Sequence, residues 1–391
     1  MRVIIAPDVA LDTESGAAGG RPFQPAARSL RVDLLTPCFW PEVRRGTERF
    51  TRELADGLLE RGHRPRLVTS HPARLSRTVE DGLPIVRLPR PPDARLRRRM
   101  WEDYVTHAPL TYLALRASDA QIAHAMHGPD AVAALRWKAH TGRPVIYSFM
   151  GVPHHDGMFE RRKRLDYVVR ALDGADAVVA LSRAAVEAFE RWFGYEARLI
   201  APGVNLRAFP LASERAEAPT IICSADLTQP RKNVALVVEA FARVRRQQPT
   251  ARLVLSRPRD ARAAARLVGT AEGVELVDLD DRAALARAYG EASVAVLASI
   301  GEAFGLVLVE ALACGTPVVA SRVGGMVEIV DRPEIGRLFD ADDVDGLAAA
   351  LLEALELEQD PATAAACRAR AEEFSTDRTT ERYLELYEEL L

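Results

Sequence analysis

Lysine and cysteine are scarce in this sequence of 391 residues, and long hydrophobic runs are missing from it. Only three of its 52 basic residues are lysines, so arginine supplies almost all of the positive charge. The cysteines lie far apart without the spacing of metal ligands, which is typical of small buried residues in a reduced cytoplasm. No apolar run approaches the roughly 18 residues that span a bilayer, and Pro7 and Asp8 interrupt the first short one, so we expect no secretory signal. The cysteines are Cys38, Cys223, Cys314 and Cys367.

The overall balance is that of a globular protein, with 48% hydrophobic and 27% charged residues and enough length for two domains. The net charge of −3 is unevenly spread. Residues 31–195 contain 27 basic and 20 acidic residues, whereas residues 196–391 contain 22 basic and 32 acidic residues. The first part therefore carries +7 and the second −10, which indicates an anionic partner for the first part. Chance variation on a solvated surface is the alternative.

Short apolar or β-branched runs alternate with helix-like runs along most of the chain. The run "RVDLLTP" precedes "RFTRELADGLLERGH", in which apolar side chains recur on one helical face until Gly62 stops the helix. "PTIICSAD" precedes "VALVVEAFARVRRQQ" in the same way. Strands that alternate with helices predict parallel sheets covered on both faces. The predicted fold class is α/β, with two doubly wound, Rossmann-like domains facing a central cleft, where open parallel sheets bind ligands.

A change in composition marks each predicted boundary. Residues 1–29 are rich in turn-forming residues, which makes them an N-terminal extension and a candidate for disorder. The segments that follow are an N-terminal domain at 30–198, a linker at 199–218 rich in proline and alanine, and a C-terminal domain at 219–375. The last segment, 376–391, is expected to form one amphipathic helix, a candidate to pack back on the N-terminal domain.

The stretch "GEAFGLVLVEALACGTPVVAS", residues 301–321, contains the strongest functional signal. It follows a buried strand, places Glu302 in a glycine-bearing loop and begins a helix near Gly305 and Leu306. Free backbone N–H groups and the positive end of the helix dipole make that turn suitable for phosphate. Glu310 lies one turn deeper on the same face, where a carboxylate can accept hydrogen bonds from the vicinal hydroxyls of a ribose. The alternative is a loop acid and an exposed helix residue.

This stretch closely resembles the Glu-x7-Glu signature of glycosyltransferase family 4, the retaining nucleotide-sugar enzymes of GT-B fold. The matching segments, within residues 31–385, include "DAVVALSRAAVEAFERWFG", "PRKNVALVVEAFARV" and "VASRVGGMVEIV". The resemblance implies that Glu310 holds the donor ribose and that Glu302 lies at the transferred sugar. It also implies that the backbone at Phe304, Gly305 and Leu306 meets the donor diphosphate.

Further residues outside the signature complete the predicted site. Lys232, in "TQPRKN", follows the first strand of the second domain, and the resemblance places it on the diphosphate leaving group, beside Arg231. His127, in "AHAMHGPDAV", matches a family histidine close to the sugar and the acceptor, and forms the predicted catalytic set with Lys232 and Glu302. Gly46 matches the second glycine of a pair that lets the backbone approach the reacting groups. A surface lysine and a structural histidine are the alternatives.

Several positions depart from the family pattern. Ala225 and Asp226 stand where glycine and arginine are usual, and we expect Asp226 to point away from the diphosphate that it would repel. Arg45 replaces the first glycine of the N-terminal pair, and Met150 stands where a histidine often occurs. These departures leave a catalytically inactive sugar-nucleotide-binding protein of GT-B fold as an alternative.

The chain also contains aspartate-rich and arginine-rich runs, and each needs an interpretation. The strings "DLDD" at 278–281 and "DADDVD" at 340–345 precede helix-like runs, so we expect helix N-caps there and no metal site. The arginine-rich residues 87–104, with Trp101, and "RRKR" at 161–164 are either solvated loops or contacts to anionic lipid or a phosphorylated acceptor. Nucleic acid is not expected, because no recognition motif accompanies these arginines.

The sequence therefore predicts a cytoplasmic, metal-independent, retaining glycosyltransferase. It would move a hexose-type sugar to a hydroxyl of a glycan, a lipid-linked molecule or a small molecule. The nucleotide diphosphate sugar is the donor substrate, and no cofactor is expected. Peripheral contact with the anionic inner face of the membrane fits the uneven charge. A GT-B nucleotide-sugar epimerase or hydrolase is the remaining alternative.

Overall fold

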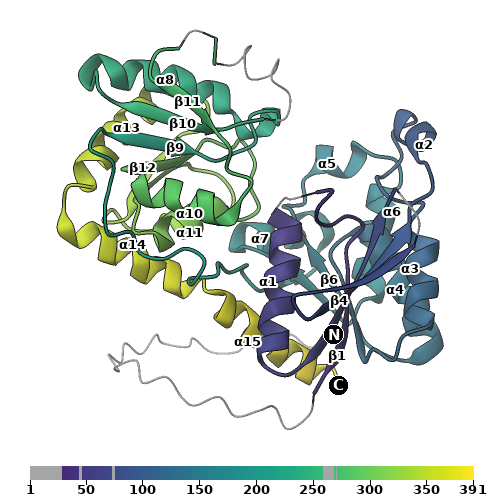
Figure 1. The fold of residues 1–391 in the computed structure, drawn as a ribbon. Helices are drawn as coiled ribbons and strands as arrows, with labels where there is room; N and C mark the ends of the chain where they lie inside the picture. Colours follow the sequence, from purple (N-terminus) through teal and green to yellow (C-terminus); the bar gives the residue numbers. More distant parts are fainter. Residues whose placement is uncertain (1–28, 44–45, 73–74, 259–267, 270) are drawn as a thin grey trace, which may run out of the picture.

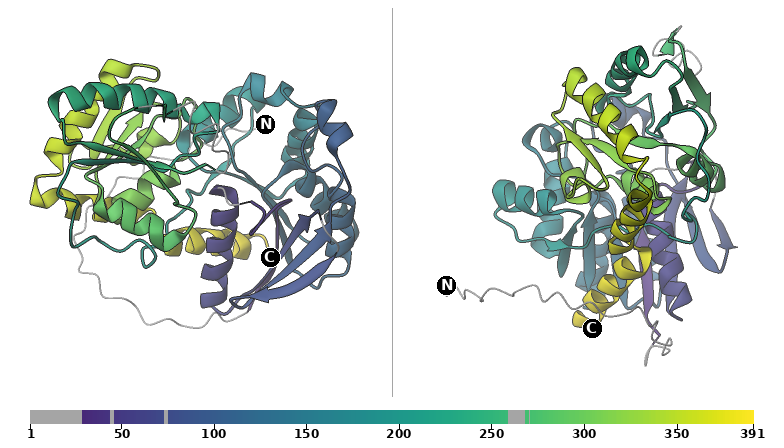
Figure 2. Two further views of the ribbon diagram at one scale, coloured as in Figure 1. Left: turned by 45° about the horizontal axis from the view of Figure 1, so that its top comes forward. Right: turned by 90° about the vertical axis from the view of Figure 1, so that its left-hand side faces the viewer.

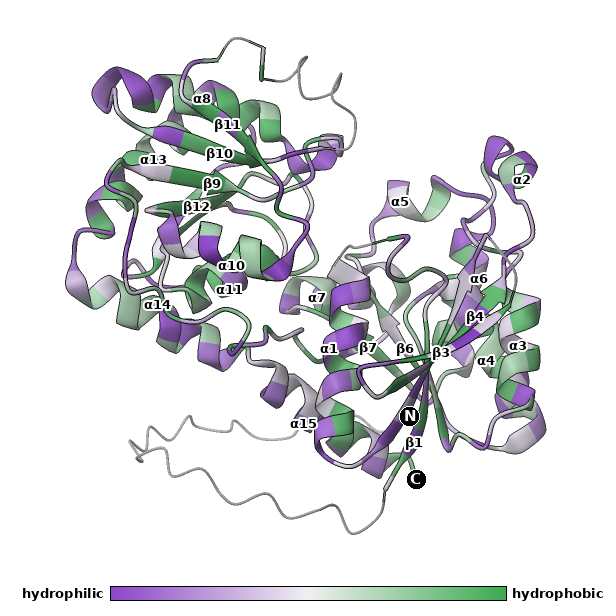
Figure 3. Cartoon of the chain, viewed as in Figure 1, coloured by the Kyte–Doolittle hydropathy of each residue, from purple (hydrophilic) through white to green (hydrophobic). Residues whose placement is uncertain are grey.

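The computed structural model describes residues 29–43, 46–72, 75–258, 268–269 and 271–391. Nearly all of the predicted extension 1–29 and the departure at Arg45 therefore lie outside the described residues. Two α/β domains, each built on one sheet, form the molecule (Figure 1). Apolar residues concentrate on the strands and on the helix faces turned toward them, whereas polar residues gather on the outer faces (Figure 3). Within the described residues, no helix combines the length and apolarity needed to cross a bilayer.

The N-terminal domain contains eight strands flanked by helices. The strands are β1 (Arg31–Leu35), β2 (Arg64–His71), β3 (Ser76–Glu80), β4 (Leu83–Pro89), β5 (Ile122–Ala125), β6 (Val145–Phe149), β7 (Ala177–Ala180) and β8 (Arg198–Leu199). The helices are α1 (Gly46–Glu60), α2 (Ala94–Arg98), α3 (Ala108–Arg116), α4 (Gly128–Thr141), α5 (His155–Phe159), α6 (Arg164–Gly174) and α7 (Arg183–Phe193). The strand order is β3-β4-β2-β1-β5-β6-β7-β8, and all neighbours are parallel except β3 and β4.

The β3–β4 hairpin was not predicted. Asp81 and Gly82 form its turn with φ values of 48° and 81°. Two consecutive residues with positive φ are typical of the tight turns that match the twist of a hairpin, and Asp-Gly is a favoured pair there. The signal was therefore in the sequence. β4 continues through Pro89, so the arginine-rich run 87–104 begins inside this hairpin.

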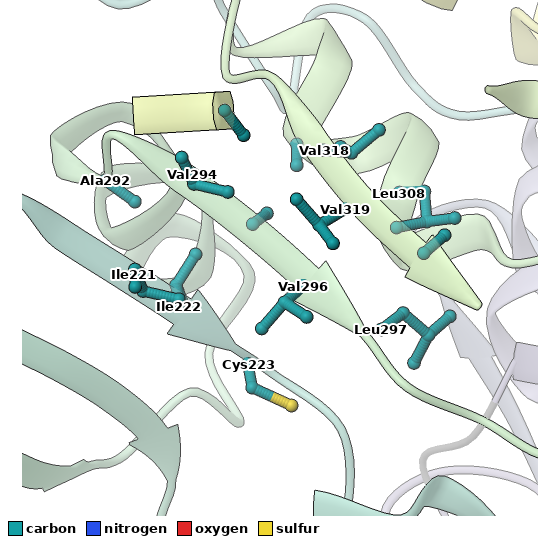
Figure 4. Packing of buried hydrophobic residues seen from close by; sticks show 14 of the residues in the cluster. Ile221, Ile222, Cys223, Ala292, Val294, Val296, Leu297, Leu308, Val318 and Val319 are labelled. Atoms are coloured by element: carbon teal, nitrogen blue, oxygen red, sulfur yellow. The ribbon is translucent and has the colours of Figure 1, made fainter. Parts of the chain in front are cut away.

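The C-terminal domain contains a six-stranded, fully parallel sheet in the order β11-β10-β9-β12-β13-β14. Its strands are β9 (Thr220–Cys223), β10 (Arg252–Ser256), β11 (Val274–Val277), β12 (Val294–Leu297), β13 (Val318–Ser321) and β14 (Gly336–Phe339). Its helices are the 3₁₀ turn η1 (Pro230–Lys232), α8 (Val234–Gln247), α10 (Arg282–Glu291), α11 (Leu306–Ala313), α12 (Met326–Ile329), α13 (Val344–Leu357) and α14 (Pro361–Glu373). The central strands are buried on both faces, which explains their unbroken apolar runs (Figure 4).

The chain crosses between the domains twice, and the two crossings are joined. The Val204 N–H donates to the Phe374 carbonyl at 2.8 Å, and the Thr376 N–H donates to the Val204 carbonyl at 3.0 Å. A Cβ on Gly203 would lie 2.4 Å from the Ser375 carbonyl carbon, so only glycine allows the segments to approach this closely. The two crossings therefore form one connection between the domains.

The C-terminal helix α15 (Thr376–Glu389) packs against α1 of the N-terminal domain (Figure 2). A Cβ on Gly57 would lie 2.2 Å from the Thr380 hydroxyl oxygen, so α15 crosses α1 at that glycine. The Tyr387 hydroxyl lies 2.7 Å from Nδ1 of the fully buried His124. Helix α15 thus completes the core of the N-terminal domain.

Candidate functional site

The loop between β12 and α11 forms the floor of the candidate site. Gly305 precedes α11 with φ 108° and ψ 47°, a left-handed conformation that favours glycine. The loop before α12 packs closely on it, because a Cβ on Gly324 would lie 2.0 Å from the Glu302 carbonyl oxygen. Among the described residues, no side chain caps α11. The Leu308 N–H donates to the Gly305 carbonyl at 2.9 Å, so the N–H groups of Leu306 and Val307 are the ones available to an anion.

Lys232 and Glu302 meet directly beside this turn. The Lys232 ammonium lies 2.5 Å from Glu302 Oε2, and Arg231 Nη1 lies 3.6 Å from the same oxygen. The side chains of Lys232 and Glu302 are each 15% exposed, whereas that of Arg231 is 52% exposed. η1, which follows β9, therefore brings a partly buried cation to the loop that follows β12. Three residues that were predicted from separate sequence segments lie together.

Glu310 lies on α11 and contacts the other domain. Its Oε1 accepts a hydrogen bond from Arg49 Nη1 of α1 at 2.9 Å, and its Oε2 lies 3.5 Å from the Tyr289 hydroxyl of α10. The residue is 4% exposed, so it is not the exposed helix residue of the alternative interpretation. Glu310 raises the pKa of Arg49 above its usual value. Arg49 and Tyr289 were not predicted as site residues, since no local pattern pairs residues so far apart.

A second ion pair lies next to the first. Arg282 Nη2 of α10 donates a hydrogen bond to Glu53 Oε1 at 2.7 Å. Glu53 lies on α1, one helical turn after Arg49. The Thr376 hydroxyl donates to the other Glu53 oxygen at 3.3 Å. Burial raises the pKa of Glu53 to about 7, even though Arg282 favours the charged form. The contact of α1 with α10 and α11 therefore includes two arginine–glutamate pairs.

His127 lies in a separate cavity of the N-terminal domain. This cavity of about 260 Å³ is lined by residues that include Met150, His154 and Arg164. His127 Nε2 is 3.9 Å from Glu102 Oε1, and its buried Nδ1 has no hydrogen-bond partner among the described residues. Burial lowers the pKa of His127, so the ring is neutral near pH 7. The His127 side chain is 29% exposed and lines the cavity, so a neutral imidazole is presented to a ligand there.

The remaining predicted positions differ in what they offer a ligand. The Phe304 side chain is 3% exposed and packs edge-on against Phe374, so only its backbone can face the site. Gly46 begins α1, with open space where a side chain would start. Met150 packs against the cores of both domains. Asp226 accepts hydrogen bonds within its own loop, from the Thr228 N–H at 2.9 Å and from Gln229 Nε2 at 3.0 Å, which satisfies the carboxylate locally.

Both aspartate strings supply helix N-caps, as predicted. Asp281 accepts from the Ala284 N–H at 2.8 Å at the start of α10, and Asp343 accepts from the Gly346 N–H at 2.9 Å at the start of α13. In the part of the chain that the structure describes, no three His, Cys, Asp or Glu side chains are grouped for metal binding.

A buried acid lies three residues after His127, and no lysine or arginine among the described residues balances its charge. Asp130, in the first turn of α4, is fully buried and accepts from the Thr111 hydroxyl at 3.1 Å. Its other neighbour, His107, lies 3.4 Å away, and burial lowers the pKa of that ring to about 3. Burial raises the pKa of Asp130 to about 7. The pair therefore supports the helix that carries His127 while both groups are neutral.

Asp130→Asn should change how stability depends on pH. The folded-state pKa of Asp130 lies above the ordinary aspartate value of about 3.8, so the folded state holds the proton more tightly than the unfolded state. Wild-type stability is therefore lost as pH rises from about 4 to about 7, by at most about 4 kcal/mol from this group. Asparagine mimics the protonated acid and does not titrate. The free energy of unfolding of the variant should therefore rise relative to that of the wild type as pH rises across that range.

Denaturant unfolding at pH 5 and pH 8 measures this difference. Asp345→Asn, at a side chain that is 85% exposed, is the control and should leave the pH dependence unchanged. Parallel stability curves for wild type and Asp130→Asn would show that Asp130 is ionised in the folded protein throughout.

Comparison with known proteins adds independent findings about the two domains. Residues 44–208 match the family model described as Glycosyltransferase Family 4, and residues 218–357 match the model described as Glycosyl transferases group 1. A D-inositol 3-phosphate glycosyltransferase of Saccharomonospora viridis is 32% identical over 239 residues, covering 56% of this chain and 54% of the relative. The relative of the same description from Mycobacterium marinum is 32% identical over 210 residues, covering 48% and 44%. The chain thus spans about half the length of the curated relatives it matches.

Solved structures share the whole architecture. A sucrose-phosphate synthase from Thermosynechococcus elongatus has a TM-score of 0.77 at 22% identity, with 92% of this chain and 99% of that chain covered. The HepE protein of Anabaena, in complex with UDP and glucose, has a TM-score of 0.72 at 17% identity, with 92% and 100% covered. At these identities the likeness shows the fold alone, which is GT-B, as predicted.

Proposed function

The chain belongs to the GT-B glycosyltransferases of family 4, and from this premise we propose that it moves a hexose-type sugar from a nucleotide diphosphate sugar to a hydroxyl acceptor, with retention at the anomeric carbon. The observation that supports this best is the contact of Lys232 with Glu302, 2.5 Å apart beside the start of α11. Glu310 lies further along the same helix. A cation beside the start of α11 and a carboxylate further along this helix support a diphosphate and a ribose as ligands.

The proposed reaction breaks the bond between the anomeric carbon and the diphosphate oxygen. The bond to the acceptor oxygen forms on the same face, and the acceptor proton passes to the leaving phosphate oxygen. Lys232 and the start of α11 stabilise the negative charge that develops on the diphosphate. His127, in the cavity of the opposite domain, binds the acceptor or the sugar. Closure of the two domains excludes water and aligns the reactants.

The departures at Asp226 and Met150 do not favour the inactive alternative. Asp226 is satisfied within its own loop, so its carboxylate need not face the diphosphate. Met150 lines the His127 cavity with an apolar surface, which suits specificity for the acceptor rather than loss of chemistry.

A panel of UDP-, GDP- and ADP-sugars tests the proposal. A donor that binds the folded protein raises the melting temperature of the protein. Sugar transfer from that donor is then measured with glycan, lipid-linked and small-molecule hydroxyl acceptors, including inositol phosphate. A product with the donor's anomeric configuration is expected. Donor binding without transfer would support the inactive alternative, whereas conversion of the donor without acceptor would support the epimerase or hydrolase.

Activity should persist in EDTA. The proposed site offsets the diphosphate charge with Lys232, Arg231 and the helix terminus, so the protein itself supplies the positive charge. We expect kcat/KM to change less than about twofold, which corresponds to about 0.4 kcal/mol. Initial rates before and after chelation measure this. Loss of activity that added Mg²⁺ or Mn²⁺ restores would contradict it.

The two basic runs lie side by side in the structure, which supports the proposed membrane contact. Trp101 pairs with Arg162 in a β-bridge, and the Glu102 N–H donates to the Arg162 carbonyl at 3.0 Å. Two apolar side chains are exposed near this bridge, Met100 at 47% and Phe159 at 63%. The exposed basic residues of this surface, which we call the basic edge, are Arg95, Arg97, Arg98, Arg99, Arg162 and Lys163.

Replacing Arg95, Arg98 and Arg99 together with alanine should weaken binding to anionic vesicles by about 100-fold. Each basic residue near an anionic surface contributes roughly 1 kcal/mol, and the attraction should fall as salt rises. Co-sedimentation with phosphatidylserine-containing and neutral vesicles measures it. Alanine at the exposed Arg136, Arg287 and Arg382 is the matched control. Equal binding of wild type to both vesicles, or to neither at low salt, would indicate a soluble acceptor.

A further inference from the structure

The carboxylate proposed to hold the donor ribose is held from both domains. Arg49 Nη1 of the N-terminal domain lies 2.9 Å from Glu310 Oε1. On the other side, the Tyr289 hydroxyl lies 3.5 Å from Oε2 and is itself 2.6 Å from the Ser224 hydroxyl. The Glu310 side chain is 5% exposed and that of Arg49 is 27% exposed. Within the part of the chain that the structure describes, Glu310 thus has one ion pair, and its partner comes from the opposite domain.

A carboxylate with this little exposure needs a positive partner, because burial of an unpaired charge is unfavourable. Arg49 supplies that charge and, through a directional N–H, also fixes where Oε1 points. A carboxylate has about four acceptor positions, so the contacts to Arg49 and Tyr289 leave positions for further donors. The orientation of Glu310 is therefore set before any hydroxyl binds, which reduces the entropy lost on binding.

We propose that Arg49 is a positioning residue for the nucleotide donor, acting through Glu310, so that the first helix of the N-terminal domain contributes to recognition of the ribose. This inference rests on the proposed function, in which Glu310 accepts hydrogen bonds from the ribose hydroxyls. It adds that donor affinity depends on a residue outside the donor domain. By thermodynamic linkage, a bound ribose also favours the arrangement in which α1 contacts α11.

The neighbouring ion pair provides a matched control. Arg282 and Glu53 also join α10 to α1, at 2.7 Å, but neither residue contacts Glu310 through a hydrogen bond. Loss of that pair weakens the same contact between the domains without removing the group that orients Glu310. A variant of Arg282 therefore separates general loosening of the interface from loss of ribose recognition.

The test compares Arg49→Met with Arg282→Met by measuring dissociation constants for ribonucleoside and 2′-deoxyribonucleoside diphosphates. UDP, GDP and ADP with their deoxy forms are the probes. Wild type should prefer the ribo form of its nucleotide by about tenfold or more, as for loss of one hydrogen bond to a charged group. Arg49→Met should reduce that preference to about threefold or less, whereas Arg282→Met should keep the wild-type preference.

Each outcome has a distinct meaning. A wild type with no ribo preference would contradict the placement of Glu310 on the ribose, and so the proposed function. A wild-type preference that Arg49→Met retains in full would overturn the positioning role alone. Tighter binding of the ribonucleoside diphosphate by Arg49→Met would also overturn the positioning role, because Arg49 would then compete with the ribose for Glu310. If Arg49→Met does not fold, Arg49→Gln, which removes the charge but keeps a polar group, is subject to the same criteria.

Discussion

Replacing Lys232 by alanine is expected to lower kcat by about 100- to 1,000-fold, as for loss of one group that stabilises charge in a transition state. The ammonium lies 2.5 Å from Glu302, beside the uncapped start of α11. Negative charge on the proposed leaving group grows as the bond to the sugar breaks, so the lysine contributes more in the transition state than in the ground state. The donor KM should therefore change much less than kcat. Steady-state kinetics at saturating acceptor separate the two constants.

Two further variants define what Lys232 contributes. Lys232→Arg keeps the charge and should recover part of kcat. Arg231→Ala should lower kcat by less than about tenfold, because that guanidinium is 52% exposed and solvent screens it. A Lys232→Ala enzyme with normal kcat and only a raised KM would mean that the lysine binds the donor without assisting departure of the diphosphate.

The features that can be derived from the sequence alone depend on short stretches of chain. Parallel strands expose their carboxyl ends along one edge of a sheet, and a ligand site forms there. Lys232 follows β9 and Glu302 follows β12, which are neighbours in the sheet. Their contact therefore follows from the order of strands and helices once the fold is known. The N-caps at Asp281 and Asp343 likewise depend on only a few residues each.

The features that the sequence did not predict depend on how distant elements meet. Arg49 and Glu310 are 261 positions apart, and no period or spacing connects them. Their contact exists because α15 packs on α1 at Gly57 and because hydrogen bonds join the linker to Phe374 and Thr376. Both contacts set how α1 faces α11. Local patterns determine helices and strands, but the orientation of two domains is determined by packing between residues that are remote in the sequence.

Glu310→Ala is expected to weaken binding of the preferred nucleoside diphosphate by about 10- to 100-fold, as for one or two hydrogen bonds to a charged group. The fold should remain intact, because the Arg49 side chain is 27% exposed and can reach water once its partner is removed. Isothermal titration with the donor nucleotide measures the affinity. Glu353→Ala, which removes an exposed glutamate 2.7 Å from Arg337, is the control and should bind as the wild type does.

The kinetic effect of Glu310→Ala should be the reverse of that of Lys232→Ala. The ribose lies away from the bond that breaks, so its contacts with Glu310 are equally strong in the ground state and in the transition state. Loss of such uniform binding raises the donor KM and leaves kcat nearly unchanged. Because Arg49 acts through Glu310 in our proposal, Arg49→Met should have little further effect in the Glu310→Ala background, although it lowers ribose discrimination on its own. Unchanged affinity of Glu310→Ala for every nucleotide sugar that wild type binds would remove both residues from the donor site.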